Sequence, residues 1–178
     1  GREFTNTYYA EGKATPEGVK ELTNRLPELG EFKFAIKEGD TVITDEITNT
    51  DDLNDEQNKK KINYPTFKYT VDASKEAGTT YDDKSNTIVV NVQNVKDLKS
   101  QYNYTISEVI PKDAVKLEDG RYYYKGVTYD PTVIDLTVNV AVNLTDQSKL
   151  DVTINKSTCN DFKNEYETTG ALELAAEK

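Results

Sequence analysis

In three segments of the sequence, apolar and polar residues alternate as they do in β-strands, and in each segment one polar residue falls at a position of the apolar set. Successive side chains of a strand point to opposite faces, so Asn164 shares a face with the two aromatic residues of FKNEY. By the same test Glu108 ends an apolar face in YNYTISEV, and Lys20 is in phase with Leu22 in GVKEL. A buried polar group destabilises a fold unless it has a partner. The pattern therefore predicts a lysine, a glutamate and an asparagine directed at the core.

These three residue types can form a covalent bond when an apolar enclosure holds them together. Desolvation favours the neutral amine of Lys20, a nucleophile, and the neutral acid of Glu108, which can polarise the Asn164 amide and carry protons. Attack of the lysine Nζ on the asparagine Cγ would release ammonia and leave an isopeptide bond, without a cofactor. A buried Lys–Glu ion pair beside a hydrogen-bonded asparagine fits the alternation at least as well. Alternation also does not show that the three strands are neighbours.

Period-two alternation continues through most of the chain and predicts an all-β fold. It is clearest in EFKFAIK, TIVVNVQNV, TVIDLTVNVAVNL and LDVTIN, which polar connectors separate. Several short strands joined by such turns predict an antiparallel, Ig-like β-sandwich. The inward set of the longest segment is Ile134, Leu136, Val138, Val140, Val142 and Leu144.

The composition excludes several classes of function. The chain has no histidine, which excludes Ser-His-Asp and Cys-His catalysis and histidine-ligated zinc. A formal charge of −10 disfavours nucleic acid and anionic membranes as partners, and no apolar run approaches the length of a membrane span. The single cysteine, Cys159, cannot form an internal disulfide, and we interpret it as an inert thiol. We expect no cofactor or metal, since the acidic cluster of Asp51, Asp52 and Asp55 is typical of solvated surface.

Five segments resemble, in chain order, those of the pilin isopeptide-linkage domain of Gram-positive surface proteins, a family that includes streptococcal T-antigen-type pilins. They are GVKELTNRLPELGEFKFAI, INYPTFKYTV, YNYTISEV, KGVTYDPTVIDLTVNVAV and FKNEY, and they lie within residues 18–166. The resemblance implies a β-sandwich with a spontaneous bond between Lys20 and Asn164, and Glu108 as the assisting acid. The sequence departs from the family pattern around residues 72–98, where we expect an inserted loop or hairpin.

The two ends of the chain resemble each other. FTNTYYAEGKATPEGVK near the N-terminus and FKNEYETTGALELAAEK at the C-terminus agree at Phe, Asn, Tyr, Gly and the final Lys. We interpret residues 1–17 as a leader that carries the end of a preceding repeat, and residues 18–166 as the isopeptide-linkage domain. Residues 167–178 would then be a linker into a following repeat. On this hypothesis Asn6 and Lys178 would bond to the neighbouring repeats.

The resemblance implies a structural stalk or pilus-shaft domain of an extracellular protein anchored to the cell wall. Its partners would be neighbouring repeats or pilus subunits, and it would not be an enzyme, because one crosslink per chain is not turnover. Lys156 lies eight residues before Asn164, near the lysine that such pilins present to a sortase, so it is either an inter-subunit linkage site or an ordinary solvated lysine.

Two alternative functions remain open from the sequence. The first is an adhesin module that binds a host protein or glycan through residues 72–98 or the tyrosine-rich strand at residues 122–124. The second is a glycoside-acting enzyme with paired carboxylates. Glu108 is the single acid that stands out against an apolar strand face, and this disfavours the enzyme.

Overall fold

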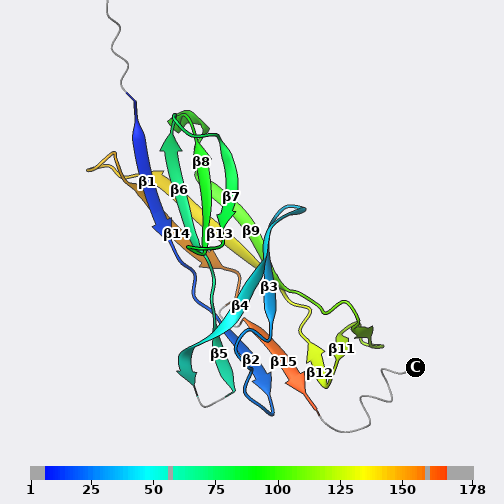
Figure 1. Cartoon of the computed structure of the whole chain (residues 1–178). Helices are drawn as coiled ribbons and strands as arrows, with labels where there is room; N and C mark the ends of the chain where they lie inside the picture. The colour runs from blue at the N-terminus through cyan, green and yellow to red at the C-terminus, as the bar shows by residue number, and fades with distance from the viewer. Residues whose placement is uncertain (1–6, 56–57, 159–160, 168–178) are drawn as a thin grey trace, which may run out of the picture. The chain divides into compact units, whose positions relative to one another are not determined.

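The computed structural model describes residues 7–55, 58–158 and 161–167 (Figure 1). In these ranges the chain forms strands and one short 3-10 helix, η1 (Val95–Asp97), which confirms the predicted all-β class. No helix in this part of the chain is long and apolar enough to cross a membrane. The strands are β1 (Tyr9–Ala14), β2 (Val19–Thr23), β3 (Lys33–Glu38), β4 (Thr41–Asp55), β5 (Lys59–Ile62), β6 (Thr66–Asp72), β7 (Gly78–Asp82), β8 (Thr87–Val92), β9 (Gln101–Glu108), β10 (Val115–Lys116), β11 (Tyr122–Tyr124), β12 (Val127–Tyr129), β13 (Val133–Val142), β14 (Leu150–Lys156) and β15 (Phe162–Tyr166).

Contacts between residues divide the chain into two compact units. The first unit comprises the described residues of Gly1–Pro16, Pro65–Tyr104 and Leu136–Lys156, and the second those of Glu17–Tyr64, Thr105–Asp135 and Ser157–Lys178. Strands β9 and β13 contribute residues to both units. The domain boundaries expected after residues 17 and 166 stay a prediction. The structure places β1, which lies inside the expected leader, in the first unit, where it pairs with β6.

The first unit contains the four-stranded sheet β1-β6-β8-β7. Strand β6 pairs antiparallel with β1 and parallel with β8, and β7 and β8 form an antiparallel hairpin. Two aromatic pairs pack β6 against β9: Phe67 with Tyr104 and Tyr69 with Tyr102, with ring centroids 5.0 and 4.9 Å apart. The insertion predicted around residues 72–98 therefore holds a hairpin, and its second strand extends the sheet beside β6.

In the second unit the strands follow the order β10-β11-β12-β15-β2-β5-β4-β3-β9. Strand β15 lies between β12 and β2, antiparallel to β12 and parallel to β2, and the arrowheads of β2 and β15 point the same way (Figure 1). The expectation of a wholly antiparallel fold is wrong at this pair and at β6–β8. Both pairs join strands separated by a long stretch of chain, which supplies the crossover that parallel strands require. The Ig-like arrangement stays a prediction.

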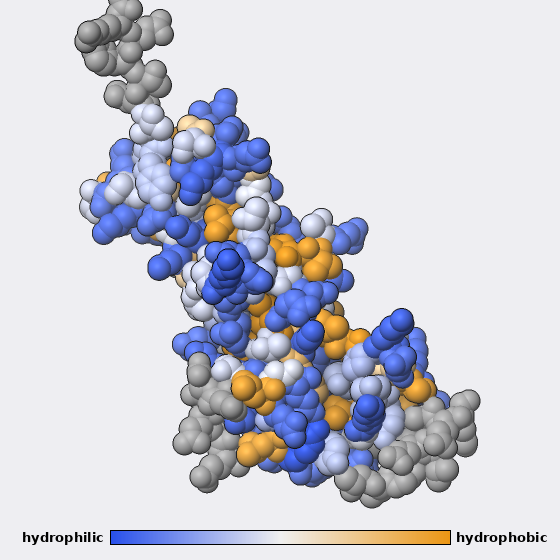
Figure 2. Space-filling view, in the orientation of Figure 1, coloured by the Kyte–Doolittle hydropathy of each residue, from blue (hydrophilic) through white to orange (hydrophobic). Residues whose placement is uncertain are grey.

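The predicted inward faces supply most of the core of the second unit. Its fully buried apolar side chains include Leu22, Phe32, Phe34, Ile36, Ile47, Ile62, Ile106 and Phe162. The predicted alternation is wrong at Leu144, which is 97% exposed, because β13 ends at Val142 and a turn begins there. The face seen in Figure 2 is mainly hydrophilic, as expected for a chain with a formal charge of −10.

Candidate functional site

Strand pairing places Lys20 and Asn164 next to each other in the second unit. Strand β15 runs parallel to β2, with Phe162 opposite Lys20. Two residues further along, Asn164 lies opposite Leu22. Lys20 and Asn164 are therefore diagonal neighbours on one face of the sheet, a separation that a long lysine side chain can span. The third predicted residue, Glu108, is the last residue of β9.

The three polar side chains form one buried cluster. Nζ of Lys20 lies 2.9 Å from Oε2 of Glu108, and both side chains are 0% exposed. Asn164 is also fully buried, and its amide is in polar contact with the Glu108 carboxylate. The ring centroid of Phe32 lies 4.6 Å from the lysine nitrogen, which adds an apolar wall to the enclosure. The structure thus brings the three residues together, and their reaction stays a prediction.

Burial shifts both ionisable groups of the cluster toward their neutral forms. It lowers the pKa of Lys20, and the facing Glu108 carboxylate opposes this shift. It raises the pKa of Glu108, and here Lys20 and the Asn164 amide act in the opposite direction. A neutral amine is the nucleophilic form of lysine, and a neutral carboxylic acid can donate a proton. Both shifts favour the forms that an amide condensation needs.

The cluster leaves buried polar atoms without well-formed hydrogen bonds. Within the described chain, Nζ of Lys20, both carboxylate oxygens of Glu108 and Nδ2 of Asn164 form no hydrogen bond of normal geometry, although Nζ and Oε2 lie 2.9 Å apart as an ion pair. Another fully buried asparagine, Asn49, differs: its Oδ1 accepts from the Phe32 N–H at 3.0 Å and its Nδ2 donates to a backbone carbonyl at 2.7 Å. Buried polar groups without well-formed hydrogen bonds are rare in folded proteins and point to strain or chemistry.

Two aspartates that were not predicted from the sequence hold the strands of the cluster. Oδ2 of Asp161 accepts from the Val19 N–H at 2.9 Å and so ties the start of β2 to the residue before β15. The Asp130 N–H donates to Oδ1 of Asn164 at 2.8 Å, and the Asp130 carboxylate accepts from the Lys163 N–H at 2.9 Å. The Asp-Pro dipeptide at residues 130 and 131 indicates a turn. The sequence does not show, however, which acceptor atom the Asp130 N–H will bind.

The other predicted sites lie elsewhere or outside the described residues. Lys156 is half-buried at the end of β14 in the first unit. In β11 the middle tyrosine is buried and its two neighbours are half-buried, so this strand does not present three free rings. Inter-subunit linkage and host binding at these positions stay predictions. Outside the described part of the chain lie Asn6, Cys159 and Lys178, together with the side chains of Asp51, Asp52 and Asp55.

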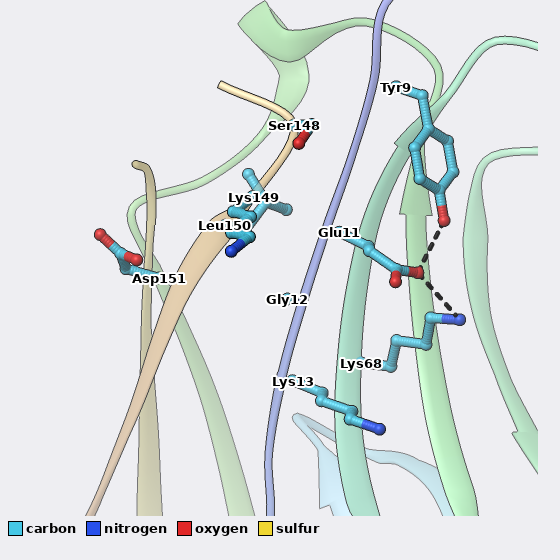
Figure 3. A pocket seen from close by; sticks show the side chains of 9 residues that line it. All are labelled: Tyr9, Glu11, Gly12, Lys13, Lys68, Ser148, Lys149, Leu150 and Asp151. Atoms are coloured by element: carbon cyan, nitrogen blue, oxygen red, sulfur yellow. Dashed lines mark hydrogen bonds and ion pairs between the residues drawn. The ribbon is translucent and has the colours of Figure 1, made fainter. Parts of the chain in front are cut away.

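A pocket of about 470 Å³ lies in the first unit, lined from β1, β6 and β14 (Figure 3). The carboxylate of Glu11 is already satisfied there, since Lys68 Nζ lies 3.2 Å away and the Tyr9 hydroxyl donates to it at 2.6 Å. Strand β1 approaches β14 closely because Gly12 has no side chain; a Cβ there would lie 2.0 Å from the Leu150 carbonyl oxygen. In the described ranges no group of three or more Cys, Asp or Glu side chains could hold a metal ion.

A comparison with known families gave a match that covers most of the chain. A family model described as "Spy0128-like isopeptide containing domain" matches residues 16–100 and 95–167. The matched segments include all three residues of the buried cluster. Domains of this family are structural parts of surface proteins and are not enzymes. A comparison with curated proteins gave no match.

Two solved structures of the major pilin from Streptococcus pyogenes are also similar to this chain. A mutant form is 17% identical with a TM-score of 0.39, and the match covers 91% of this chain and 51% of that one. The other structure is 18% identical with a TM-score of 0.37, covering 92% and 52%. This chain thus spans about half the length of those pilin structures.

Proposed function

The chain belongs to the family of Spy0128-like isopeptide containing domains, and from this premise we propose that it is a structural module of a pilus shaft or surface stalk. A spontaneous isopeptide bond joins Lys20 to Asn164, with Glu108 as the assisting acid. The parent protein is anchored to a Gram-positive cell wall, and its partners are neighbouring repeats or pilus subunits. The proposal depends on one observation, a fully buried lysine amine 2.9 Å from a buried carboxylate, beside a buried asparagine whose amide nitrogen has no well-formed hydrogen bond.

The reaction needs only the groups of this cluster. The neutral Nζ of Lys20 attacks Cγ of Asn164, a new C–N bond forms, and the bond from Cγ to Nδ2 breaks. Glu108, starting as the neutral acid, gives a proton to Nδ2, which leaves as ammonia, and takes one from the attacking nitrogen, so the carboxyl group is regenerated. Because the fold holds nucleophile and amide together out of water, the step is effectively unimolecular, with effective molarities on the order of 10⁵ M or more in well-oriented cases.

The bond also removes a buried polar group that lacks a well-formed hydrogen bond in the folded core. Departure of Nδ2 as ammonia eliminates one buried donor that has no well-formed hydrogen bond. The Lys20 amine becomes a neutral amide N–H that can donate to Glu108, so no charge has to remain in the core. The alternative, an unreacted buried ion pair, retains the desolvation penalty of two charges. The energetics of the cluster therefore favour the condensed state.

We expect the intact protein, measured by mass spectrometry under denaturing conditions, to be lighter than its sequence by one ammonia. Proteolysis should release a branched peptide in which tandem fragmentation places the branch between Lys20 and Asn164. Asn164→Ala should show the full mass of its own sequence. A wild-type protein with the unmodified mass would instead establish the buried ion pair.

A second expectation concerns Lys156 as the residue that joins the next subunit. A pilus-assembling sortase supplied with a sorting-motif peptide should label the protein at Lys156, and Lys156→Arg should abolish labelling, because arginine cannot serve as the amine nucleophile. Lys149→Arg, a change at an exposed lysine just before β14, is the matched control and should leave labelling intact. Labelling at another lysine would contradict this role.

A further inference from the structure

The side-chain oxygen of Asn164 is already held by a hydrogen-bond donor. The backbone N–H of Asp130 donates to Oδ1 at 2.8 Å, and the asparagine is 0% exposed. When an amine attacks the amide carbon, negative charge develops on this oxygen. A fixed N–H in a site that excludes water stabilises such charge far more strongly than a donor in water does.

Several features of the fold hold this N–H in place. The carboxylate of Asp130 accepts two backbone hydrogen bonds, from Lys163 and from Thr132, each at 2.9 Å. Lys163 immediately precedes Asn164, so the residue that supplies the donor is tied to the strand that carries the acceptor. Asp130 also precedes Pro131, and a following proline restricts a residue to extended backbone conformations. Strand β12, which ends one residue earlier, pairs with β15.

We propose that the Asp130 N–H is the oxyanion donor of the condensation between Lys20 and Asn164, and that the Asp130 carboxylate is the positioning group that holds it. This inference rests on the proposed function. As Nζ bonds to Cγ, the carbonyl electron pair moves onto Oδ1 and is stabilised by the N–H. When that pair returns, the bond from Cγ to Nδ2 breaks and ammonia leaves.

The two sides of the amide then have separate roles. Asp130 holds the oxygen, whereas Glu108 contacts the amide and is the group that can exchange protons with Nζ and Nδ2. This division leaves Glu108 free to carry protons, because the task of polarising the carbonyl belongs to a backbone group that does not titrate.

Replacing the amide by an ester at residue 130 tests the proposal. Cell-free translation with the α-hydroxy analogue of aspartate removes the N–H and keeps the side chain. Acid-quenched samples, weighed over time, give the rate of ammonia loss. We expect this ester to slow the reaction by about 10²–10³-fold, the usual effect of losing one oxyanion donor. The matched control is an ester at Thr132, whose N–H donates to the Asp130 carboxylate and not to a reacting atom. This control ester removes one backbone hydrogen bond, and the net contribution of one such bond is small. We therefore expect it to slow the reaction by less than about tenfold.

A purely structural role would affect both esters alike. In a Glu108→Gln background, where no bond should form, the two esters should lower the melting temperature by similar amounts. Equal slowing at residues 130 and 132, or no slowing at residue 130, would overturn the inference while leaving the proposed function intact. A wild-type chain that keeps its ammonia would overturn both.

Ordinary substitutions give a second test that needs no backbone chemistry. Asp130→Asn keeps a side-chain oxygen that can accept one of the two N–H groups, and Asp130→Ala keeps neither. The rate of ammonia loss should therefore fall from wild type to Asn and again to Ala. Equal rates in all three proteins would refute the positioning role of the carboxylate.

Discussion

Glu108→Gln should fold and yet keep the full mass of its sequence. Glutamine preserves the size of the side chain but cannot give a proton to the leaving nitrogen and take one from Lys20. Loss of general acid–base assistance should slow ammonia release by about 10²–10⁴-fold. The Lys20 amine also loses the carboxylate 2.9 Å away, which opposes the lowering of its pKa. The variant therefore holds a more neutral amine that still does not condense.

A carboxylate on the same strand as the asparagine provides the control. Glu165→Gln makes the same chemical change at the exposed residue after Asn164. It should condense at the wild-type rate, as measured by intact mass after timed expression. If Glu108→Gln also lost ammonia at the wild-type rate, another group would have to carry the proton.

Asn164→Ala should cause the second large effect, a loss of thermal stability. The proposed bond would close a loop from residue 20 to residue 164, and chain-entropy reasoning developed for disulfides gives about 5 kcal/mol for a loop of that length. For a domain of this size that corresponds to about 10–20 °C in melting temperature. Scanning calorimetry of the two proteins should show the difference, and reductant should not change it, because an amide is not reducible by thiols.

A double-mutant cycle separates the bond from the side chains that form it. Glu108→Gln and Asn164→Ala should each lower the melting temperature by a similar amount, since either change prevents the same bond. Combining them should cost little more, because coupled residues that act as a unit are not additive. Additive losses would show that the two side chains stabilise the fold independently and that no bond joins them.

Alternation predicted the burial of the cluster but not its assembly. Lys20, Glu108 and Asn164 all proved buried, because a strand with one face on the core buries every second residue. Their meeting depends on the parallel pairing of β15 with β2, a contact between distant parts of the chain that local pattern does not encode. Alternation also cannot separate a reactive asparagine from a structural one. The buried Asn91 is saturated by Thr70 and three backbone carbonyls.

Two features were not predicted from the sequence, the role of Asp130 and the place of strand β1. The first depends on a backbone atom and the second on a contact between distant parts of the chain. Asp130 contributes an N–H, a group that every residue except proline carries, so its residue type gives no signal of the role. Strand β1 was expected to be part of a leader because the resemblance begins near residue 18. Its place in the first unit depends on pairing with β6, more than fifty residues later in the chain.

The parallel pairing of β2 with β15 determines how this module would respond to a pulling force. The chain enters the pair at Val19 and leaves it at Tyr166, at opposite ends of two strands that run the same way. Tension applied there acts in shear and loads all the hydrogen bonds between the strands at once, whereas an antiparallel pair would open one bond at a time from a shared end. A covalent bond between Lys20 and Asn164 would prevent the two strands from sliding past each other. Tension would then cross from one strand to the other, the chain between them would not lengthen, and a fibre built of such modules would behave as a tether of fixed length.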